Sequence, residues 1–178
     1  MTNNQQPTTN KGFTIIETLV AVAILVAVVV GTMGAVQTAI SSYIYSKDQI
    51  IAFYLAQEGF EQIRNLRDEN RLAGRNWLYG IAQYSSDACY FGKVCIVSPV
   101  DALWPVQCSG GTGACPYLRQ EPAAGFYGYT STWNDTQFRR EITLTSINAE
   151  EISVNITVSW KKGLVSRQFR TRENLLNW

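Results

Sequence analysis

The sequence predicts an α+β fold, in which one long N-terminal helix packs on an antiparallel β-sheet head with a cysteine-containing insertion. An uncharged, mostly apolar stretch near the N-terminus continues into a segment with helical spacing, and no proline separates the two. From Gln137 onward, apolar and polar side chains alternate with the period of a β-strand. Four cysteines lie between these two parts of the chain.

The apolar stretch is long enough to cross a membrane as a helix. Residues 18–46 carry no charge, and their apolar centre runs from Leu19 to Val30. A helix of about 20 apolar residues spans the hydrocarbon core of a bilayer. Many of these residues are valines, which are poor helix formers in water, but in lipid the backbone must satisfy its own hydrogen bonds. We therefore expect residues 13–40 to be the transmembrane half of the helix.

The helix is expected to continue beyond the membrane with one apolar face. Apolar residues recur there with helical spacing. They are Val36, Ile40, Ile44, Ile51, Leu55, Gly59, Ile63 and Leu66. This pattern predicts a single helix from about Thr14 to about Leu66, of which residues 41–68 form an amphipathic half. Residues 69–178 are then left for the globular head.

A glycine stands directly before the apolar stretch. In an ordinary secretory signal peptide the small-residue cleavage site follows the apolar run, so cleavage removes that run. Here the small residue is Gly12, and cleavage after it would leave the hydrophobic helix on the mature chain. Glu17 is also unusual, because a carboxylate inside a membrane helix costs a few kcal/mol and therefore usually has a partner or a function.

The segment from Lys11 to Glu17, which reads KGFTIIE, resembles the class III signal of type IV prepilins and of type II secretion pseudopilins. The resemblance implies that a membrane prepilin peptidase cuts the Gly12–Phe13 bond, removes residues 1–12 as a leader and N-methylates the new amine of Phe13. It also implies assembly with other pilin subunits into a filament whose core is formed by the N-terminal helices. A platform protein and an assembly ATPase would drive that assembly indirectly.

Two interpretations of Glu17 remain open. After cleavage the positive amine of Phe13 lies one helical turn from Glu17, so Glu17 of one subunit can pair with this amine in its neighbour and set the register of assembly. Alternatively, Glu17 is an N-terminal helix carboxylate that the helix dipole favours. The Gly-Phe junction before it favours the assembly role.

A stripe of small residues runs along the apolar helix. Such a stripe lets helices approach closely and predicts helix packing, although alanine and glycine are also simply common in membrane helices. The stripe consists of Ala23, Ala27, Gly31, Ala35 and Ala39. Many major pilins carry a helix-kinking proline in this region, whereas this chain has Gly31 and Gly34. Any local melting of the helix during assembly would therefore depend on these glycines.

The four cysteines suggest two disulfides in an exported head. Pairing Cys89 with Cys95 and Cys108 with Cys115 is the simplest arrangement, but three arrangements are possible. The alternative is one zinc site made of all four thiolates. We favour disulfides, because structural zinc sites usually have gaps of about two to four residues between ligands, and neither gap here fits.

The C-terminal third predicts an antiparallel meander. The expected strands are Glu141–Thr145, Glu151–Trp160 and Leu164–Thr171, with a turn at Lys161–Gly163 between the last two. One face of these strands is apolar and would pack on the second half of the long helix. The tail Asn174–Trp178 is apolar enough to dock on the head.

Composition argues against an enzyme and against nucleic-acid binding. The chain has no histidine, which removes the commonest general base and metal ligand, and it has no hydrolase, metalloprotease or P-loop motif. No cofactor and no metal site is predicted. A set of arginines in and around the predicted strands could form a basic stripe, namely Arg139, Arg140, Arg167, Arg170 and Arg172. With a net charge of only +1, a solvated sheet face balanced by glutamates is the simpler interpretation.

These features predict a minor pilin subunit of a type IV pilus, and the segment Leu55–Asp68 resembles minor pilins of the PilV kind. The alternative within the family is a pseudopilin of type II secretion or competence, acting in protein export or DNA uptake. Outside the family, a signal-anchored enzyme or a zinc-binding adhesin is possible. The expected location is the cytoplasmic membrane, with one membrane pass and an extracytoplasmic head, before assembly into a surface pilus or periplasmic pseudopilus.

Overall fold

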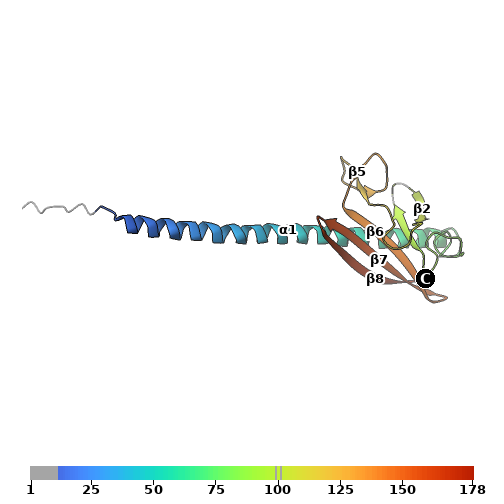
Figure 1. The fold of residues 1–178 in the computed structure, drawn as a ribbon. Helices are drawn as coiled ribbons and strands as arrows, with labels where there is room; N and C mark the ends of the chain where they lie inside the picture. Colours follow the sequence, from blue (N-terminus) through green and yellow to red (C-terminus); the bar gives the residue numbers. More distant parts are fainter. Residues whose placement is uncertain (1–11, 99, 101) are drawn as a thin grey trace, which may run out of the picture. The chain divides into compact units, whose positions relative to one another are not determined.

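The computed structural model describes residues 12–98, 100 and 102–178, so the predicted leader lies outside the described residues except for Gly12. The chain forms two compact units that divide between Ser46 and Lys47. In the first unit, the described chain is helical from Ile15 onward. The second, called the head below, comprises residues 47–178 and contains the end of the same helix and all the described strands (Figure 1).

Helix α1 runs from Ile15 to Leu72, six residues beyond the expected end. It stops at a Schellman motif, the hydrogen-bonded cap that closes many helices. Gly74 adopts a left-handed conformation with φ of 67°, which a residue without Cβ accepts readily. The N–H of Arg75 donates to the carbonyl of Asn70 over 2.8 Å, and the N–H of Gly74 donates to the carbonyl of Arg71 over 3.0 Å.

The last turns of α1 are held by polar contacts, which the apolar spacing did not reveal. Asn70 is buried and donates from Nδ2 to the carbonyl of Tyr79 over 2.8 Å. Arg67 is also buried, and its Nη1 donates to the carbonyl of Leu176 over 3.0 Å. Buried polar groups are tolerated when they are hydrogen-bonded in this way. The helix therefore continues past Leu66 without further apolar residues on its buried face.

A five-stranded antiparallel sheet forms the main layer of the head, in the order β2-β1-β6-β7-β8. Its strands are β1 (Val94–Ser98), β2 (Ala102–Gln107), β6 (Phe138–Asn148), β7 (Glu151–Lys162) and β8 (Val165–Leu176). The predicted meander is confirmed as β6, β7 and β8. Each strand is longer than expected, and β8 includes most of the C-terminal tail.

The turn between β7 and β8 differs from the prediction. Lys161 and Lys162 were expected in the turn, but they belong to β7 and pair with Ser166 and Val165. The turn consists of Gly163, with φ of 59°, and Leu164. Glycine at the left-handed position suits a two-residue hairpin connection. Both lysines therefore stand at the end of a long hairpin.

The strands between α1 and β6 were not predicted. Strand β1 is buried along its whole length and so lacks the alternation of a half-exposed strand. A small antiparallel sheet has the order β4-β3-β5, with β3 at Arg119–Gln120, β4 at Tyr127–Gly128 and β5 at Asn134–Asp135. Strands of two residues have no readable period, so sequence patterns cannot find them.

Two disulfides close the cysteine-containing insertion. Cys89 pairs with Cys95, and Cys108 pairs with Cys115, with Cα–Cα distances of 5.2 and 5.0 Å. This is the simplest of the three possible arrangements. Because all four sulfurs are bonded to each other in pairs, none is free as a thiolate ligand for zinc.

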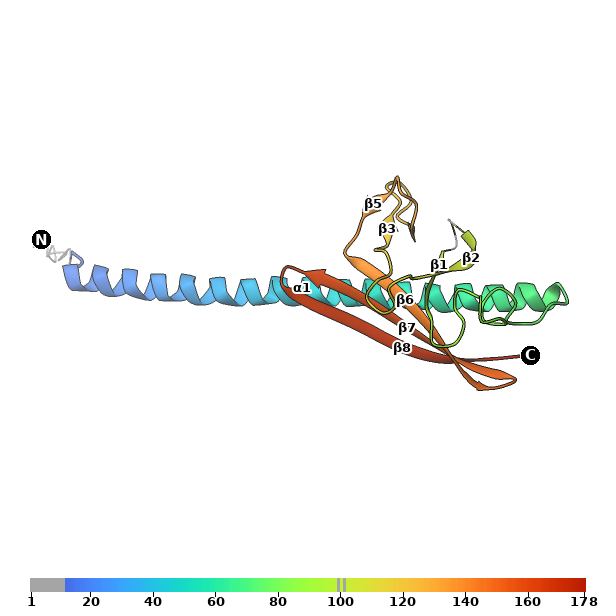
Figure 2. The same cartoon turned by 45° about the vertical axis from the view of Figure 1, so that its right-hand side comes forward.

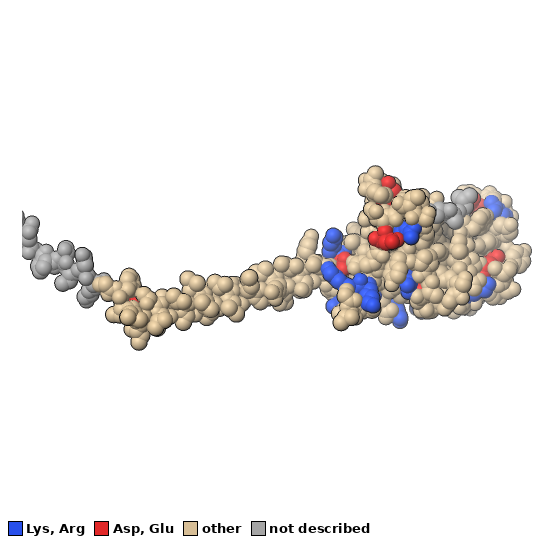
Figure 3. All heavy atoms as spheres, turned by 45° about the horizontal axis from the view of Figure 1, so that its top comes forward, with Lys and Arg blue, Asp and Glu red and all other residues tan. Residues whose placement is uncertain are grey.

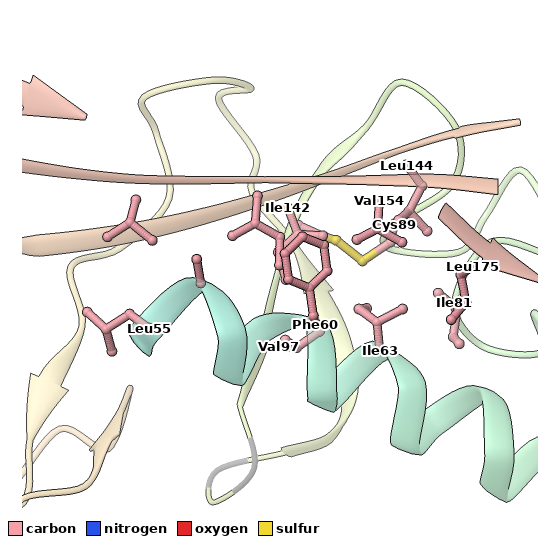
Figure 4. Close-up of a cluster of buried hydrophobic side chains, with 14 of the residues drawn as sticks. Leu55, Phe60, Ile63, Ile81, Cys89, Val97, Ile142, Leu144, Val154 and Leu175 are labelled. Atoms are coloured by element: carbon pink, nitrogen blue, oxygen red, sulfur yellow. A yellow bond between two sulfur atoms is a disulfide. The ribbon is translucent and has the colours of Figure 1, made fainter. Parts of the chain in front are cut away.

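The head part of α1 packs on one face of the main sheet (Figures 1 and 2). Leu55, Phe60 and Ile63 of α1 project toward Ile142, Leu144 and Val154 on the strands, and all six are buried (Figure 4). Gly59 lies where the helix approaches the sheet most closely. A Cβ at this position would come within 2.9 Å of Cδ1 of Ile156 and 3.2 Å of Cδ of Arg140.

Arg140 corrects the prediction that the arginines form one solvated face. Its side chain is fully buried between the sheet and α1. Nη1 donates to the carbonyl of Leu55 over 2.9 Å and to Oε2 of Glu58 over 3.0 Å, and Nη2 donates to the carbonyl of Val97 over 2.8 Å. Arg167, Arg170 and Arg172 are exposed, so the five arginines do not share a single surface.

A second charged contact joins α1 to the edge of the sheet. Glu173 on β8 accepts a hydrogen bond from Nη2 of Arg64. This hydrogen bond raises the pKa of the Arg64 guanidinium, and the charges of Glu173 and Glu61 add to the effect. Both Arg64 and Glu173 remain partly exposed, so the pair orients β8 on the helix more than it stabilises the head.

Candidate functional site

The candidate site is the segment that links Gly12 to the apolar part of α1. Gly12 and Phe13 precede the first helical turn, and the Phe13 side chain is 81% exposed. A Cβ at Gly12 would meet no described atom within 4 Å. The described fold therefore places no demand for glycine at this position. The peptide bond between Gly12 and Phe13 is open to another molecule.

Thr14 caps the N-terminus of α1. Its carbonyl accepts hydrogen bonds from the N–H groups of Glu17 and Thr18, over 3.1 and 3.2 Å, and its Oγ1 lies 3.4 Å from the Glu17 nitrogen. The order Thr14-x-x-Glu17 has the spacing of a capping box. This cap was not predicted, although its sequence signal was present. The cap starts the helix directly after Thr14, so Gly12 and Phe13 lie outside it.

Glu17 is the single charged residue between Gly12 and Ser46. It lies in the first turn of α1, where the partial positive charge of the helix N-terminus favours a carboxylate. Its position one turn from Phe13 agrees with both interpretations of its role.

The side chains of α1 before the head form an exposed apolar surface. Every residue from Gly12 to Tyr43 is exposed, and among the described residues α1 is the one helix long and apolar enough to span a membrane. A helix that is apolar on all sides needs lipid or other protein around it. This segment therefore has the surface of a membrane helix or of a filament core.

Three threonine hydroxyl groups within this surface are satisfied inside the helix. Thr18, Thr32 and Thr38 donate from Oγ1 to the carbonyls of Ile15, Val29 and Gly34 over 2.8–3.1 Å. Back-bonding of this kind removes the cost of placing a hydroxyl in lipid. The segment thus presents few polar groups to an apolar environment.

The small-residue stripe of Ala23, Ala27, Gly31 and Ala35 lies on this exposed surface. A Cβ at Gly31 or at Gly34 would meet no described atom within 4 Å. The glycines therefore leave room that the described chain does not use. Packing against a second helix stays a prediction for these positions.

An open cavity lies in the described part of the head. The cavity, of about 490 Å³, lies beside the small sheet and is lined by Tyr117, Tyr129 and the ion pair of Arg119 with Asp135, whose atoms are 2.8 Å apart. Arg139 stacks over the Tyr117 ring nearby. Within the described part of the chain, no group of three or more His, Cys, Asp or Glu residues could hold a metal ion.

Comparison with known proteins identifies the N-terminal segment. The family model for the prokaryotic N-terminal methylation motif matches residues 8–33, which include the Gly12–Phe13 junction, Glu17 and part of the apolar helix. No curated protein and no solved structure matches the chain significantly. The match is confined to the N-terminal segment and carries no information about the head.

The motif and the fold agree with each other. The motif places a processing signal directly before an apolar helix, and that helix continues into a head with an antiparallel sheet and two disulfides. Such a motif is found in a structural subunit that associates with other pilin subunits and with a prepilin peptidase, and the exposed apolar helix fits membrane anchoring. The match at residues 8–33 supports a class III prepilin signal, the kind that type IV pilin-like proteins carry.

Proposed function

We propose that this chain is a minor pilin subunit of a type IV pilus, incorporated into the filament through residues 13–40 after cleavage of the Gly12–Phe13 bond. The observation that carries the proposal is the exposed Gly-Phe junction directly before a helix that is apolar on every side. The match to the methylation motif at residues 8–33 supports the same conclusion.

Processing changes the charge at the start of the helix. Hydrolysis of the Gly12–Phe13 bond by the prepilin peptidase leaves a carboxylate on the leader and a free amine on Phe13. Methylation replaces one N–H hydrogen of this amine and retains its ability to carry a positive charge. The mature chain then has one cation, at Phe13, and one anion, at Glu17, at the end of an otherwise uncharged segment.

These two charges are the basis of the assembly contact. A carboxylate that moves into an apolar filament core requires a partner, because an unpaired charge there is costly. The Phe13 ammonium of a neighbouring subunit supplies that partner and fixes the axial register of the two helices. Thr14, which caps each helix, holds the start of the helix in a defined geometry for this pairing.

The head acts outside the cytoplasm. Two disulfides within a single head are typical of an oxidising compartment, which supports an extracytoplasmic head and a cytoplasmic N-terminus. A platform protein and an assembly ATPase would then move the subunit from the cytoplasmic membrane into the filament. The resemblance of Leu55–Asp68 to PilV-type subunits supports a minor pilin over a pseudopilin. The chain would work as a structural subunit rather than as an enzyme.

Mass analysis of the N-terminus tests processing. The protein recovered from membranes of the native host is expected to begin at Phe13 and to carry one methyl group there. Recovery of a chain that retains residues 1–12, or that starts beyond the apolar segment, would overturn the proposal. Location of the mature subunit in sheared surface pili supports a pilus, whereas its confinement to a secretion-dependent periplasmic fibre identifies the pseudopilin alternative.

The variant Glu17→Gln tests the assembly contact. Removing the carboxylate charge is expected to leave processing at Gly12 intact but to lower the amount of subunit in sheared filaments by roughly tenfold to a hundredfold, since a charged hydrogen bond contributes about 1.5–3 kcal/mol. Immunoblotting of the filament and membrane fractions measures this. Glu69→Gln, which changes an exposed carboxylate elsewhere on α1, is the control and should assemble normally. Normal incorporation of the Glu17→Gln subunit into filaments would contradict pairing with the Phe13 amine and would leave the helix-dipole contact as the role of Glu17.

A further inference from the structure

The turn between β7 and β8 forms an exposed tip that is both basic and apolar. Lys161 and Lys162 end β7, and Arg167 stands near the start of β8. Between them, Leu164 is 98% exposed and Val165 is 54% exposed. A large apolar side chain that is almost completely exposed contributes nothing to the folding of the head. This tip, residues 161–167, therefore has a surface suited to contact with something else.

The sequence around the tip is strongly biased toward positive charge. Residues 152–172 contain five basic residues and no acidic residue, although the whole chain has a net charge of only +1. Figure 3 shows Lys and Arg side chains gathered at the end of the head where the β7–β8 turn lies. Three acidic residues, Glu150, Glu151 and Glu173, lie at or near the other end of the strands. The remaining acidic residue of the meander, Glu141 on β6, is buried and accepts a hydrogen bond from the N–H of Gly113.

Contacts within the head show where the tip lies relative to α1. The rings of Phe53 on α1 and Phe169 on β8 are 5.9 Å apart. Farther along both elements, Arg67 on α1 bonds to the carbonyl of Leu176 on β8. Strand β8 and the head part of α1 therefore run side by side in the same direction. Moving backward along β8 from Phe169 leads toward the end of the head that contains Lys47, the first residue of the head part of α1.

The tip reaches beyond that end. Five residues separate Phe169 from Leu164, which is about 16 Å of strand. Six residues separate Phe53 from Lys47, the first residue of the head, which is about 9 Å of helix. The tip therefore projects past the first turn of the head by several ångströms. The uncharged apolar stretch of the sequence ends at Ser46, directly before that turn.

We propose that the β7–β8 tip docks on the anionic lipid surface of the membrane that anchors the chain. Lysine and arginine near an anionic leaflet are attracted to its headgroups, and an exposed leucine adds a small apolar anchor at the interface. The covalent tether at Lys47 holds the tip close to the membrane, so that a weak contact is sufficient. The contact holds the head on the bilayer before assembly, and extraction into a filament breaks it.

This inference rests on the proposed membrane anchoring, and a crosslinking experiment separates the two. The full chain, with p-benzoylphenylalanine in place of Leu164, is reconstituted into vesicles of phosphatidylcholine with and without phosphatidylglycerol and then irradiated. A matched chain carries the same group in place of Ile147, which is 49% exposed near the opposite end of the meander. Flotation of the vesicles reports anchoring, and mass spectrometry identifies the adducts.

Lipid adducts are expected from position 164 in vesicles that contain phosphatidylglycerol, and not from position 147. Adding Lys161→Gln and Lys162→Gln should lower the adduct by about 25-fold, since each lysine near an anionic surface changes occupancy by roughly fivefold. Adducts between two copies of the chain, or equal labelling from both positions, would overturn the lipid contact while flotation persists. Loss of flotation would instead overturn the proposed anchoring.

Discussion

At the scale of single residues, Arg140 connects three elements of the head. Its guanidinium reaches the carbonyl of Leu55 on α1, the carboxylate of Glu58 on α1 and the carbonyl of Val97 on β1. The alternation of β6 places Arg140 on the same buried face as Ile142 and Leu144. The position of Arg140 was therefore readable from the strand period, but its charge pointed to solvent. A planar group with several donors suits this role, because it satisfies carbonyls on different elements at once.

Replacing Arg140 with methionine tests this role. The variant Arg140→Met keeps the apolar part of the side chain but leaves buried carbonyl groups without their donor. We expect the head to lose about 2–3 kcal/mol of unfolding free energy. Guanidinium unfolding of the full chain in detergent micelles, followed by tryptophan fluorescence, measures the change. Arg170→Met alters an exposed arginine of β8 and should change stability by less than about 0.5 kcal/mol. Equal losses of unfolding free energy in the two variants would contradict a special role of the buried Arg140 in holding α1, β1 and β6 together.

Glu121 makes a hydrogen bond whose strength is expected to depend on pH. Its carboxylate accepts a hydrogen bond from the N–H of Ala124, and this backbone bond lowers the pKa of Glu121 from the usual value of 4.5. A lowered pKa means that the contact is complete above pH 4.5 and is lost as the pH falls through the lower folded value. In an NMR titration, the Ala124 amide signal should move with a midpoint below 4.5. In Glu121→Gln this movement should disappear, and its persistence would assign the shift to another group.

At the scale of elements, α1 has two different environments along one continuous helix. Its first part exposes every residue from Ile15 to Tyr43, whereas its head part buries Leu55, Phe60 and Ile63 against the sheet. Gly59 permits the close approach on the buried side. Glycine is a poor helix former, so its presence at a helix–sheet contact indicates a packing reason.

Substituting one glycine in each part of α1 tests whether the two parts differ in how tightly they are packed. Gly59→Val places branched carbons against Ile156 and is expected to destabilise the head by about 1–3 kcal/mol through overpacking. Gly34→Val makes the same change where no described atom lies within 4 Å, so unfolding of the head should be unchanged. Thermal unfolding of both full-length variants in detergent distinguishes them. A destabilised Gly34→Val head would show that the apolar segment contributes to head stability.

At the scale of the whole molecule, the exposed apolar helix leaves the chain incomplete as a single subunit in water. Residues 13–40 expose large aliphatic side chains on all sides, including Leu19, Ile24 and Met33. Lipid covers this surface before assembly and sister helices cover it afterward in the proposed function. A filament needs close helix packing, whereas a lipid anchor does not. A change in the small-residue stripe is therefore expected to affect the filament state and not the membrane-anchored state.

Gly31→Leu tests the filament state without changing the anchor. The chain itself has room for the larger side chain, so membrane retention and head stability should be unchanged. If the stripe packs against a sister helix, overpacking of about 1–3 kcal/mol should lower recovery in filaments by roughly tenfold or more. Val28→Leu, outside the stripe, is the matched control and should assemble normally. The ratio of subunit in sheared filaments to subunit in membranes is the measurement, and equal ratios would remove the stripe from the assembly interface.

The sequence by itself determined the features that depend on local order and composition. The processing signal at Gly12 and Phe13, the long apolar helix and the C-terminal meander all depend on neighbouring residues, on side-chain period or on segment length. These signals are strong because membrane helices and half-exposed strands impose a pattern on every residue they contain. Even the Thr14 cap had a sequence pattern that could have been recognised.

Only the tertiary structure decided the features that depend on partners far apart in the chain. The end of α1 at Leu72 depends on carbonyls near the C-terminus and after the helix, and the burial of Arg140 depends on acceptors from α1 and β1. The insertion needed three-dimensional contacts to define its strands and to select one disulfide pairing among three. Long-range partners leave no period in the sequence, so their contacts become visible only when the chain is folded.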